Sequence, residues 1–468
     1  MAYTKEEIHA IVEKQRVFFL SNQTLDISFR KKQLIKLKEA IKTNAEKLEK
    51  ALYEDLGRCD AEAYFCDIGD VIMEINECIK GLRKWSKPET HFSGLACFPS
   101  IFTKVYKMPY GVSLIISPFN FPVLLSIGVL AAAIAGGNTA VLKMSSKSQA
   151  CTQALKEIIA ETFDPEYVIV IDGGHDIADF CLEERFDKIF YTGSPNVGKH
   201  VMEMASKNLT PVTLELGGET GNWCIIRKDA NLKDAARKIA FFKICNSGQI
   251  CIDINQVAVA EEVADLFIEE LQAAIIKQIG EKPYLNPEYP KLIGQRAYDN
   301  IAKEAEQYHE RIVFGGEGDP TTLKFSPTII YPVDINEPIV NHEIFGPLLP
   351  IVKYKDAEIN QLLDVIARRE HGLALYIFTK NKKWAKKVMQ TQQYGGGCIN
   401  EVCLHLMVKG VPFNGTGHSG MGAYHGIWGF REFTHPSTVL FGKTKMNLSL
   451  REHPYNKKKK KILSSFLK

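Results

Sequence analysis

The first ninety residues carry the spacing of amphipathic helices. Leucine and isoleucine recur three, four or seven positions apart with Lys and Glu between them, so that one face of each helix is apolar. A capping signal at Thr43–Glu46 divides this stretch. A further helix is predicted over 62–85, before Pro88, because the residue preceding a proline avoids helical backbone angles. The apolar positions are Leu34, Leu37, Ile41, Leu48 and Leu52.

From Gly111 the pattern changes to short apolar runs that alternate with helical stretches. Such alternation is typical of a parallel sheet with helices on its faces, and these sheets bind ligands at the carboxyl ends of their strands. The predicted strands are 112–116, 139–143, 167–171 and 188–191, and the predicted helices are 121–135, 147–163 and 195–207.

A second series of the same kind runs from residue 222 to about residue 400. The chain is therefore predicted to be an α/β protein of two αβ domains with parallel sheets and a cleft between them. Residues 102–108 alternate loosely and predict a strand that leads away from the body as an oligomer contact. The second series has predicted helices at 232–245 and 263–279 and predicted strands at Val257, Ile312, 328–331 and 349–354.

Length and composition agree with this organisation. A chain of 468 residues exceeds one ordinary core, so two or three domains are expected. The formal net charge of +3, from 58 basic and 55 acidic residues, gives no field suited to nucleic acid, and no such partner is predicted.

The cysteine content predicts a reducing compartment, the cytoplasm. The 11 cysteines are an odd number without framework spacing, which favours free thiols. The first residues lack the apolar core of a signal peptide, and the longest apolar run, 121–135, is too short to span a bilayer. No CxxC pair or HExxH pattern occurs, so no metal site is expected.

One cysteine has a distinctive setting. Cys251 follows the polar, glycine-containing turn Asn246–Ile250 and precedes a β-run, which places a thiol at a strand edge beside a pocket. Glu215 ends an apolar strand before two glycines, where the backbone opens. A thiol nucleophile with a separate carboxylate base can form a thioester and hydrolyse it. For Cys245, at the end of a predicted helix, a buried structural thiol is favoured.

Three further positions follow predicted strands at the same sheet edge. The turn Gly193–Gly198 leads into a helix, whose free N–H groups can hold a phosphate, although such glycines are often only turn formers. Lys143 ends a neighbouring strand and favours the phosphate interpretation over a surface role. Asn120 stands between two aromatic residues and before a proline. Its amide can donate to an oxyanion, with a simple turn-forming role as the alternative.

Two loops in the second half carry candidate groups. Asn341–Pro347 brings Glu343 and Phe345 beside a tight turn, where they could bind ribose hydroxyls and flank a flat ring, or only pack the loop. Residues 415–426 contain five glycines and can lie close to other backbones.

Three histidines lie near one another in the sequence. Structural or substrate-lining roles are favoured for them, because no acidic or cysteine partner is evident that completes a metal-ligand set. They are His405, His418 and His425.

Taken together, these motifs resemble the aldehyde dehydrogenase superfamily over nearly the whole chain. The runs Gln15–Phe19, Phe29–Leu34, Ala51–Leu56 and Gly420–Gly426 are similar to its class 3-type branch, which lacks a longer N-terminal arm. Several matching motifs in the same order are more specific than any one alone.

The resemblance implies catalytic roles for three residues. Cys251 would be the nucleophile, Glu215 the general base, and Asn120 with the Cys251 N–H the oxyanion hole. The reaction would be oxidation of an aldehyde, medium-chain aliphatic or aromatic, to its acid.

The resemblance also implies NAD or NADP as the cofactor. Lys143 would meet the adenosine ribose, beside Ser146, and the turn with Gly193, Ser194 and Gly198 would hold the pyrophosphate. Glu343 would bind the nicotinamide ribose, with Phe345 beside the ring.

The implied architecture has a Rossmann-like cofactor domain, a catalytic domain and a small β-arm used for homodimerisation. The expected limits are 1–211 for the NAD(P)-binding domain, with an arm segment at about 93–110, and 212–400 for the catalytic domain. Residues 401–445 would return to the cofactor domain and the arm, and 446–468 would form a basic tail.

The chain departs from the family pattern at several positions. Ser146 stands where a glutamate is often found after the ribose lysine; a carboxylate there would repel a 2′-phosphate, so tolerance of NADP as well as NAD is predicted. Glu219 stands in place of a usual Lys or Asn, and His418 in place of an Asn. These changes bear on substrate preference rather than on the fold.

The tail joins Lys457–Lys461 to four apolar residues, Ile462, Leu463, Phe466 and Leu467. Lysines attract anionic lipid surfaces, but four apolar residues anchor poorly. A disordered, solvated tail is favoured over a membrane contact.

Two other functions are weighed against aldehyde oxidation. A CoA-acylating dehydrogenase would pass the thioester to coenzyme A, but Glu215, as a water-activating base, would waste the acyl group. A non-catalytic binding protein is disfavoured because Cys251, Glu215 and Asn120 are all present.

Overall fold

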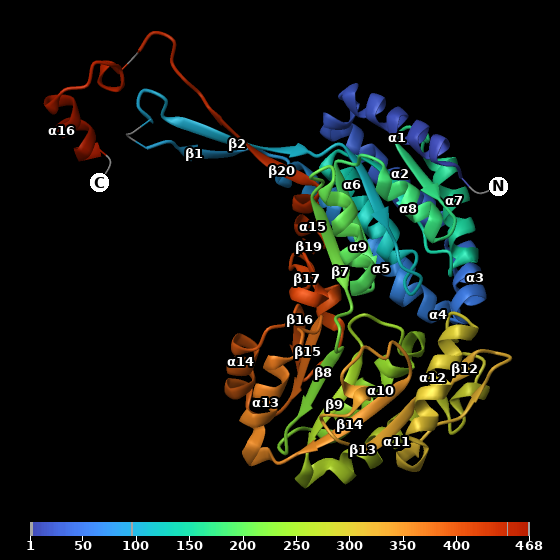
Figure 1. The fold of residues 1–468 in the computed structure, drawn as a ribbon. Coiled ribbons are helices and arrows are strands. Elements are labelled where there is room, and N and C mark those ends of the chain that lie inside the picture. Colours follow the sequence, from blue (N-terminus) through green and yellow to red (C-terminus); the bar gives the residue numbers. More distant parts are fainter. Residues whose placement is uncertain (1–2, 95–96, 447, 467–468) are drawn as a thin grey trace.

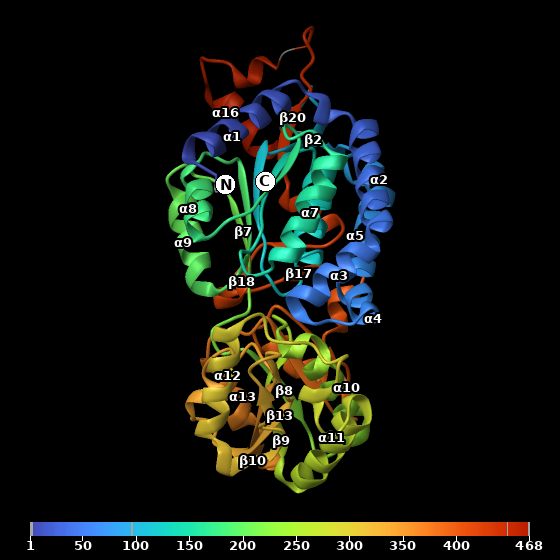
Figure 2. The same ribbon diagram turned by 90° about the vertical axis from the view of Figure 1, so that its right-hand side faces the viewer.

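The protein is described by a computed structural model covering residues 3–94, 97–446 and 448–466. Two α/β domains stand end to end, and a thin arm projects from the first (Figure 1). Turned by 90°, the same view shows the helices of the first domain flanking its sheet (Figure 2).

A six-stranded sheet forms the centre of the first domain, in the order β18-β7-β6-β3-β4-β5. Its strands are parallel except for the short β18, which is antiparallel to β7. All four strands predicted after Gly111 are confirmed. The strands are β3 (Val112–Ile116), β4 (Thr139–Lys143), β5 (Val168–Ile171), β6 (Lys188–Gly193), β7 (Val212–Leu216) and β18 (Gly420–Met421).

Helices cover this sheet, and the predicted apolar positions of the first ninety residues are all fully buried. The predicted break at residue 44 is confirmed, but Asn44 makes no side-chain capping bond to α3; its Nδ2 donates back to the Ala40 carbonyl. The helices are α1 (Lys5–Leu20), α2 (Ile27–Thr43), α3 (Ala45–Leu56), α4 (Asp60–Ala63), α5 (Gly69–Trp85), α6 (Val129–Gly136), α7 (Gln149–Thr162), α8 (His175–Glu183), α9 (Pro195–Ser206) and α15 (Ile427–Glu432).

The second domain has a seven-stranded sheet in the order β10-β13-β14-β9-β8-β15-β16, with only β10 antiparallel to its neighbour. Its strands are β8 (Asn222–Ile226), β9 (Ile254–Ala260), β10 (Ile312–Phe314), β13 (Thr328–Val333), β14 (Leu348–Tyr354), β15 (Ala374–Phe378) and β16 (Gly396–Ile399). Its helices are α10 (Leu232–Ile244), α11 (Ala264–Ile279), α12 (Gln295–Gln307), α13 (Ile359–Arg368) and α14 (Lys382–Thr391).

The change from one sheet to the other lies after Leu216, beyond the limit at residue 211 that the family resemblance implied. β7 pairs in parallel with β6 along its whole length, so the strand that carries Glu215 belongs to the first sheet. The chain re-enters this sheet at β18, where Gly420 lies opposite Glu215.

The arm is a three-stranded antiparallel sheet in the order β1-β2-β20. It combines β1 (Glu89–Phe92) and β2 (Phe102–Pro109) with β20 (Thr434–Leu440) from near the other end of the chain. The predicted strand at 102–108 is confirmed, and the arm already begins at β1.

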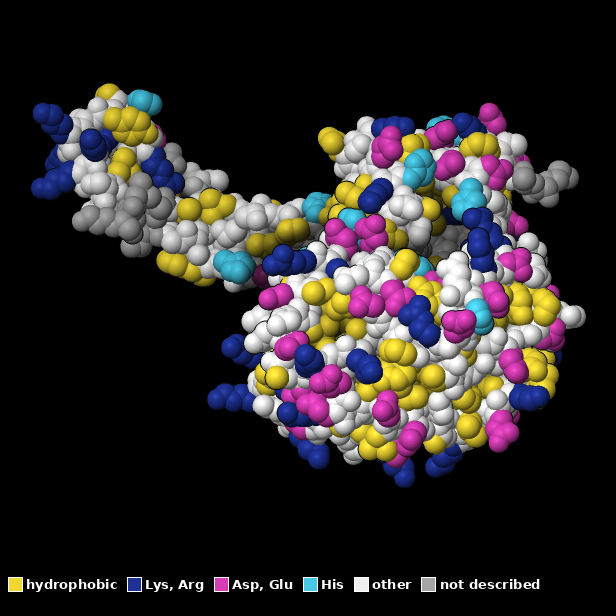
Figure 3. Space-filling view, turned by 60° about the horizontal axis from the view of Figure 1, so that its bottom comes forward, with side chains coloured by type: hydrophobic (Ala, Val, Ile, Leu, Met, Phe, Trp, Pro, Cys, Tyr) yellow, Lys and Arg dark blue, Asp and Glu magenta, His cyan; other side chains and the backbone are white. Residues whose placement is uncertain are grey.

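The expectation of a disordered tail is wrong, because Lys457–Phe466 forms helix α16 beyond the arm. Asn456 supplies a helix-starting bond, accepting from the Lys459 N–H at 2.8 Å, and lysine and leucine are good helix formers. Lysine and arginine side chains gather at this end of the molecule (Figure 3). Among the described residues, α16 and every other helix is too short or too polar to cross a membrane.

Candidate active site

The residues before Cys251 form a turn in the left-handed backbone region. Asn246 has φ 49° and Ser247 has φ 52°, and Gly248 has φ 70°. A non-glycine residue held there costs about 1–3 kcal/mol. A Cβ on Gly248 would lie 2.4 Å from the Gly346 carbonyl oxygen, so only glycine fits at that position. The turn persists because its surroundings hold it.

Arg58, fully buried, holds this turn from the first domain. Its Nε donates to Asn246 Oδ1 at 3.0 Å, its Nη1 pairs with Asp67 at 2.6 Å, and its Nη2 donates to the Asn120 carbonyl. The guanidinium also lies 4.4 Å from the centre of the Phe121 ring. One rigid, planar cation therefore fixes Asn120 relative to the turn of the other domain.

Further hydrogen bonds complete the turn. The Asn246 N–H donates to Glu62 Oε1 at 2.7 Å, and Ser247 Oγ lies 3.0 Å from the Tyr289 hydroxyl. Asn120 Nδ2 donates to the Gln249 carbonyl at 3.1 Å. The Asn120 amide is thereby held beside the backbone that leads to Cys251, with a second N–H left to donate.

The Cys251 thiol and the Glu215 carboxyl lie close enough in the cleft between the domains that each shifts the pKa of the other. Burial raises the pKa of Glu215 to about 7, and the approaching Cys251 thiol and the charge of His425 offset part of that rise. Neither oxygen of the Glu215 carboxyl has a hydrogen-bond partner within the described residues. Burial, followed by the Glu215 charge, also raises the pKa of the Cys251 thiol. A carboxyl that titrates near neutrality and has free acceptor sites is suited to accept a proton.

Glu343 enters the same cleft from the second domain. Burial and then the charge of Glu215 raise the pKa of Glu343 to about 8. A Cβ at Gly217 would lie 1.9 Å from Glu343 Oε1, so this glycine makes room for the carboxyl. Phe345, two residues after Glu343, has φ 51°. Its ring packs edge to face against the Phe119 ring, with 5.9 Å between the ring centres.

A narrow apolar cavity of about 60 Å³ opens beside Cys251. Apart from Asp70, whose pKa burial raises to about 6, its wall is almost wholly hydrophobic or thiol-bearing, which suits a nonpolar molecule. The wall includes Phe65, Cys66, Phe121, Leu124, Phe242, Cys245, Ile252, Cys403, Leu406, Met407 and Phe413.

Lys143 and Ser146 lie at another part of the sheet edge. Lys143 Nζ donates to the carbonyls of Met144 at 2.7 Å and Gly173 at 2.8 Å, which leaves one of its three N–H donors for a ligand. Burial lowers the pKa of Lys143. Ser146 is exposed and, with Gly173, lines a broad hollow between α3 and α7. The free N–H of Lys143 and the exposed hydroxyl of Ser146 could donate hydrogen bonds to a ribose.

The start of α9 leaves its own donors unused. Ser194 is the N-cap residue but makes no side-chain capping bond, and it is exposed. A Cβ at Gly193 would lie 2.2 Å from the Tyr191 hydroxyl, and one at Gly198 would lie 2.9 Å from Leu216. Backbone N–H groups at an open helix start, approached over glycine, fit a pyrophosphate.

The comparison with known proteins agrees with this geometry. The sequence model described as "Aldehyde dehydrogenase family" matches residues 1–439. The chain belongs to the aldehyde dehydrogenase family. The 4,4'-diaponeurosporen-aldehyde dehydrogenase of Staphylococcus aureus is 38% identical over 453 residues, which cover 96% of this chain and 97% of that protein. A dog relative named "Aldehyde dehydrogenase, dimeric NADP-preferring" is 36% identical, covering 93% of this chain and 94% of its own.

A solved structure shares the whole fold of this aldehyde dehydrogenase. Staphylococcus aureus AldH, in a substrate-bound state, superposes with a TM-score of 0.94 at 37% identity, covering 98% of this chain and 99% of that one. Further relatives are named as family 3 members, which confirms the class 3-type resemblance. The protein is thus an NAD- or NADP-dependent enzyme that oxidises aldehydes to carboxylic acids.

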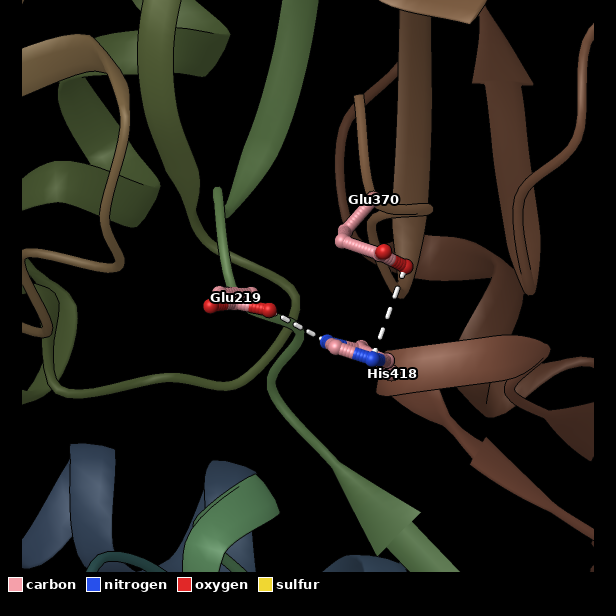
Figure 4. Close-up of side chains that lie close together, drawn as sticks. All are labelled: Glu219, Glu370 and His418. Atoms are coloured by element: carbon pink, nitrogen blue, oxygen red, sulfur yellow. Dashed lines mark hydrogen bonds and ion pairs between the residues drawn. The ribbon is translucent and has the colours of Figure 1, made fainter. Parts of the chain in front are cut away.

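Two departures from the family pattern meet in space. His418 Nδ1 contacts Glu219, and its Nε2 lies 3.7 Å from Glu370 (Figure 4). His418 therefore has two acidic partners that were not evident in the sequence, and His425 Nδ1 lies 3.2 Å from Glu74 Oε2. The two carboxylates contact opposite nitrogens of the His418 ring.

His405 has the structural role that the sequence favoured. It lies against Tyr376 and Phe413, and burial lowers its pKa to about 4. Cys245 is likewise a buried thiol at the end of α10.

The role of Arg58 is not evident from the sequence. Arg58 lies between Gly57 and Cys59 after an amphipathic helix, and nothing in its local pattern separates it from a surface arginine. Its partners lie up to 188 positions away. The glycine before it, in the left-handed conformation at the end of α3, is the single local sign of a sharp turn.

Proposed function

We propose that Cys251 is the nucleophile of this aldehyde dehydrogenase, Glu215 its general base and Asn120 its oxyanion donor. The observation that carries the proposal is the meeting of the Cys251 thiol with the buried Glu215 carboxyl, whose pKa is raised to about 7. The arrangement suits both a thiol attack and a later attack by water.

In the first half of the reaction, the Cys251 sulfur bonds to the aldehyde carbon while Glu215 takes the thiol proton. The carbonyl oxygen becomes an oxyanion, which receives hydrogen bonds from Asn120 Nδ2 and the Cys251 N–H. Bound NAD or NADP supplies the hydride acceptor that converts this thiohemiacetal to a thioester.

In the second half, Glu215 first releases its proton to solvent and then removes one from water. The resulting hydroxide attacks the thioester carbon, the carbon–sulfur bond breaks, and the acid leaves. Because Glu215 has two free acceptor oxygens, one can orient the water while the other solvates the developing charge.

The cofactor would bind along the first sheet. Lys143 holds the adenosine ribose with its spare N–H, Ser146 lies beside it, and Gly193, Ser194 and Gly198 cradle the pyrophosphate. Ser146 is uncharged and exposed, so it does not repel a 2′-phosphate; comparable kcat/KM with NAD and NADP is expected.

Glu343 would hold the nicotinamide ribose, with Phe345 beside the ring. The room that Gly217 leaves for the Glu343 carboxyl, and the fixed turn that presents Phe345, support this placement.

We propose medium-chain aliphatic or aromatic aldehydes as substrates. The narrow apolar cavity beside Cys251 supports this class, and the Staphylococcus aureus relative is named for 4,4'-diaponeurosporen-aldehyde.

A homodimer formed through the arm is proposed because β1, β2 and β20 project away from the body and a relative is named as dimeric. A cytoplasmic location is proposed from the 11 free thiols.

The test is NAD(P)H formation, followed at 340 nm, with hexanal or benzaldehyde and either cofactor, with and without coenzyme A. We expect turnover that is independent of coenzyme A and falls by more than about 10³-fold in Cys251→Ser. Full turnover by Cys251→Ser would overturn the assignment, and a strict need for coenzyme A would replace hydrolysis with acyl transfer.

A further inference from the structure

Two cysteines that the proposed reaction does not use lie side by side in the wall of the apolar cavity. Cys66 belongs to the π-helical turn Tyr64–Ile68 of the first domain, and Cys245 directly follows α10 in the second. Their Sγ atoms are 3.4 Å apart, which is van der Waals contact between two sulfurs. Both side chains line the cavity beside Cys251.

The two thiols differ in access. Cys66 is half-buried, whereas Cys245 is 4% exposed. Behind the pair, Cys245 Sγ lies 3.7 Å from Glu62 Oε1, and Arg58 Nε lies 3.7 Å from the same oxygen. Cys66 is therefore the more accessible thiol to a small reagent, and the Cys245 sulfur is in contact with it.

We propose that Cys66 and Cys245 are a hydroperoxide-reactive thiol pair whose disulfide joins the two domains and constricts the aldehyde cavity. The effect on turnover rests on the proposed function of Cys251, but formation of the bond does not. The pair is a modification site distinct from the nucleophile.

The chemistry needs hydrogen peroxide or an alkyl hydroperoxide as the oxidant. The Cys66 sulfur attacks the terminal peroxide oxygen, the O–O bond breaks, and the thiol proton leaves with the alcohol, or with water from hydrogen peroxide. Cys66 is then a sulfenic acid. The Cys245 sulfur attacks it, the S–S bond forms, and water leaves with the Cys245 proton. Two electrons pass from the sulfurs to the peroxide, and a thiol reductant reverses the bond by exchange.

The position of the bond explains its effect. Cys245 immediately precedes the strained residue Asn246, and Cys66 lies in a segment of the other domain. A covalent link fixes the domains to each other at the cavity wall. Because the cavity is narrow, a small inward shift excludes the bulkiest aldehydes first.

Peptide mapping tests the bond without relying on activity. The full chain is treated with tert-butyl hydroperoxide, its free thiols are alkylated, and it is digested with trypsin. Cys66 lies on peptide 59–80, and Cys245 lies with Cys251 on peptide 244–277. We expect these two peptides to be linked in the native chain, unlinked in Cys66→Ser and Cys245→Ser, and still linked in the matched control Cys59→Ser.

A link that survives in Cys66→Ser or Cys245→Ser, or a bond confined within peptide 244–277, overturns the proposal. The kinetic arm compares decanal before and after oxidation. We expect an about tenfold rise in KM, which dithiothreitol reverses, since the loss of a methylene-sized space in an apolar pocket is worth about tenfold or more. Cys66→Ser should show no such rise.

Peptide mapping and kinetics distinguish a failure of the thiol-pair proposal from a failure of the proposed function. Linked peptides without a KM change overturn the constriction of the cavity. Linked peptides in a protein with no aldehyde turnover before oxidation contradict the proposed function and leave the thiol pair standing.

Discussion

Two glycine-containing turns of the proposed site are built in opposite ways. The turn Asn246–Gly248 is buried at every residue and holds strained backbone angles through bonds to Arg58, Glu62 and Tyr289. The turn at Gly193–Pro195 is open, and Ser194 makes no capping bond.

The difference follows from what each turn must do before a ligand arrives. A nucleophile and its oxyanion donor must already be in place, so hydrogen bonds within the protein hold the turn and the Asn120 side chain, while one Asn120 N–H stays free for the oxyanion. A phosphate-binding turn must keep its N–H donors free for the ligand. It therefore lies at the surface, where water accepts hydrogen bonds from these donors until the ligand binds. Changes near the first turn should therefore have larger effects than changes near the second.

The largest effect is expected for Glu215→Gln. Removal of the base lowers kcat by about 10²–10⁴-fold, measured at saturating hexanal and NAD. In the native enzyme, kcat should fall as the pH drops through about 7, where Glu215 becomes protonated. If Glu215→Gln kept this pH profile, Glu215 would not be the general base.

The same substitution should raise stability at alkaline pH. The folded-state pKa of Glu215 lies above the ordinary 4.5, so its contribution to stability is full below pH 4.5 and is lost as the pH rises through 7. Gln stays neutral. At pH 8 we expect the free energy of unfolding of Glu215→Gln to exceed that of the native enzyme by on the order of 3 kcal/mol. At pH 4.5 the two proteins should differ by nearly zero. Urea denaturation at both pH values measures the difference.

Arg58→Ala should destabilise the fold by about 3–5 kcal/mol, because it leaves the Asp67 charge buried and unpaired. The matched control is Arg311→Ala. Arg311 and Glu337 form a surface ion pair whose side chains are 36% and 22% exposed. This substitution should lower the free energy of unfolding by less than about 1 kcal/mol. Equal losses of urea stability in the two variants would contradict the view that the buried network holds the nucleophile turn.

Ser146→Glu acts on the open edge. A carboxylate there should lower kcat/KM for NADP by about fivefold while leaving kcat/KM for NAD nearly unchanged, since an exposed like-charge contact is worth about 1 kcal/mol. Steady-state kinetics with both cofactors at low salt measure this ratio, and Ser145→Glu serves as the neighbouring control. An equal loss with NAD would show a general distortion instead of repulsion.

The smallest effects are expected for two serine-to-alanine substitutions, one in each turn. Ser194→Ala should weaken NAD binding by about threefold and leave stability unchanged, because a single exposed hydrogen bond is lost. Ser247→Ala should instead lower the unfolding free energy by about 1 kcal/mol, since its hydroxyl contacts Tyr289 in the core. Reversed outcomes would contradict the contrast between the two turns.

Much of the secondary structure could be predicted because its signals are local. Apolar periodicity identified α2, α3, α7 and α9, and the runs that became β3 to β6. The sheet to which β7 belongs could not be predicted, because it depends on the pairing of β7 with β6, which no local pattern states. The tail was misjudged because its lysine run suggests solvation, whereas Asn456 starts a helix there.

The candidate site divides in the same way. The sequence alone determined which residue types stand near strand ends: a thiol at 251 before β9, a carboxyl at 215 near the end of β7 and an amide at 120 after β3. Only the tertiary structure decided that Arg58 clamps the nucleophile turn and that Cys66 touches Cys245, 179 positions away. Those contacts arise between domains, where burial and shape, rather than neighbouring residues, choose the partner.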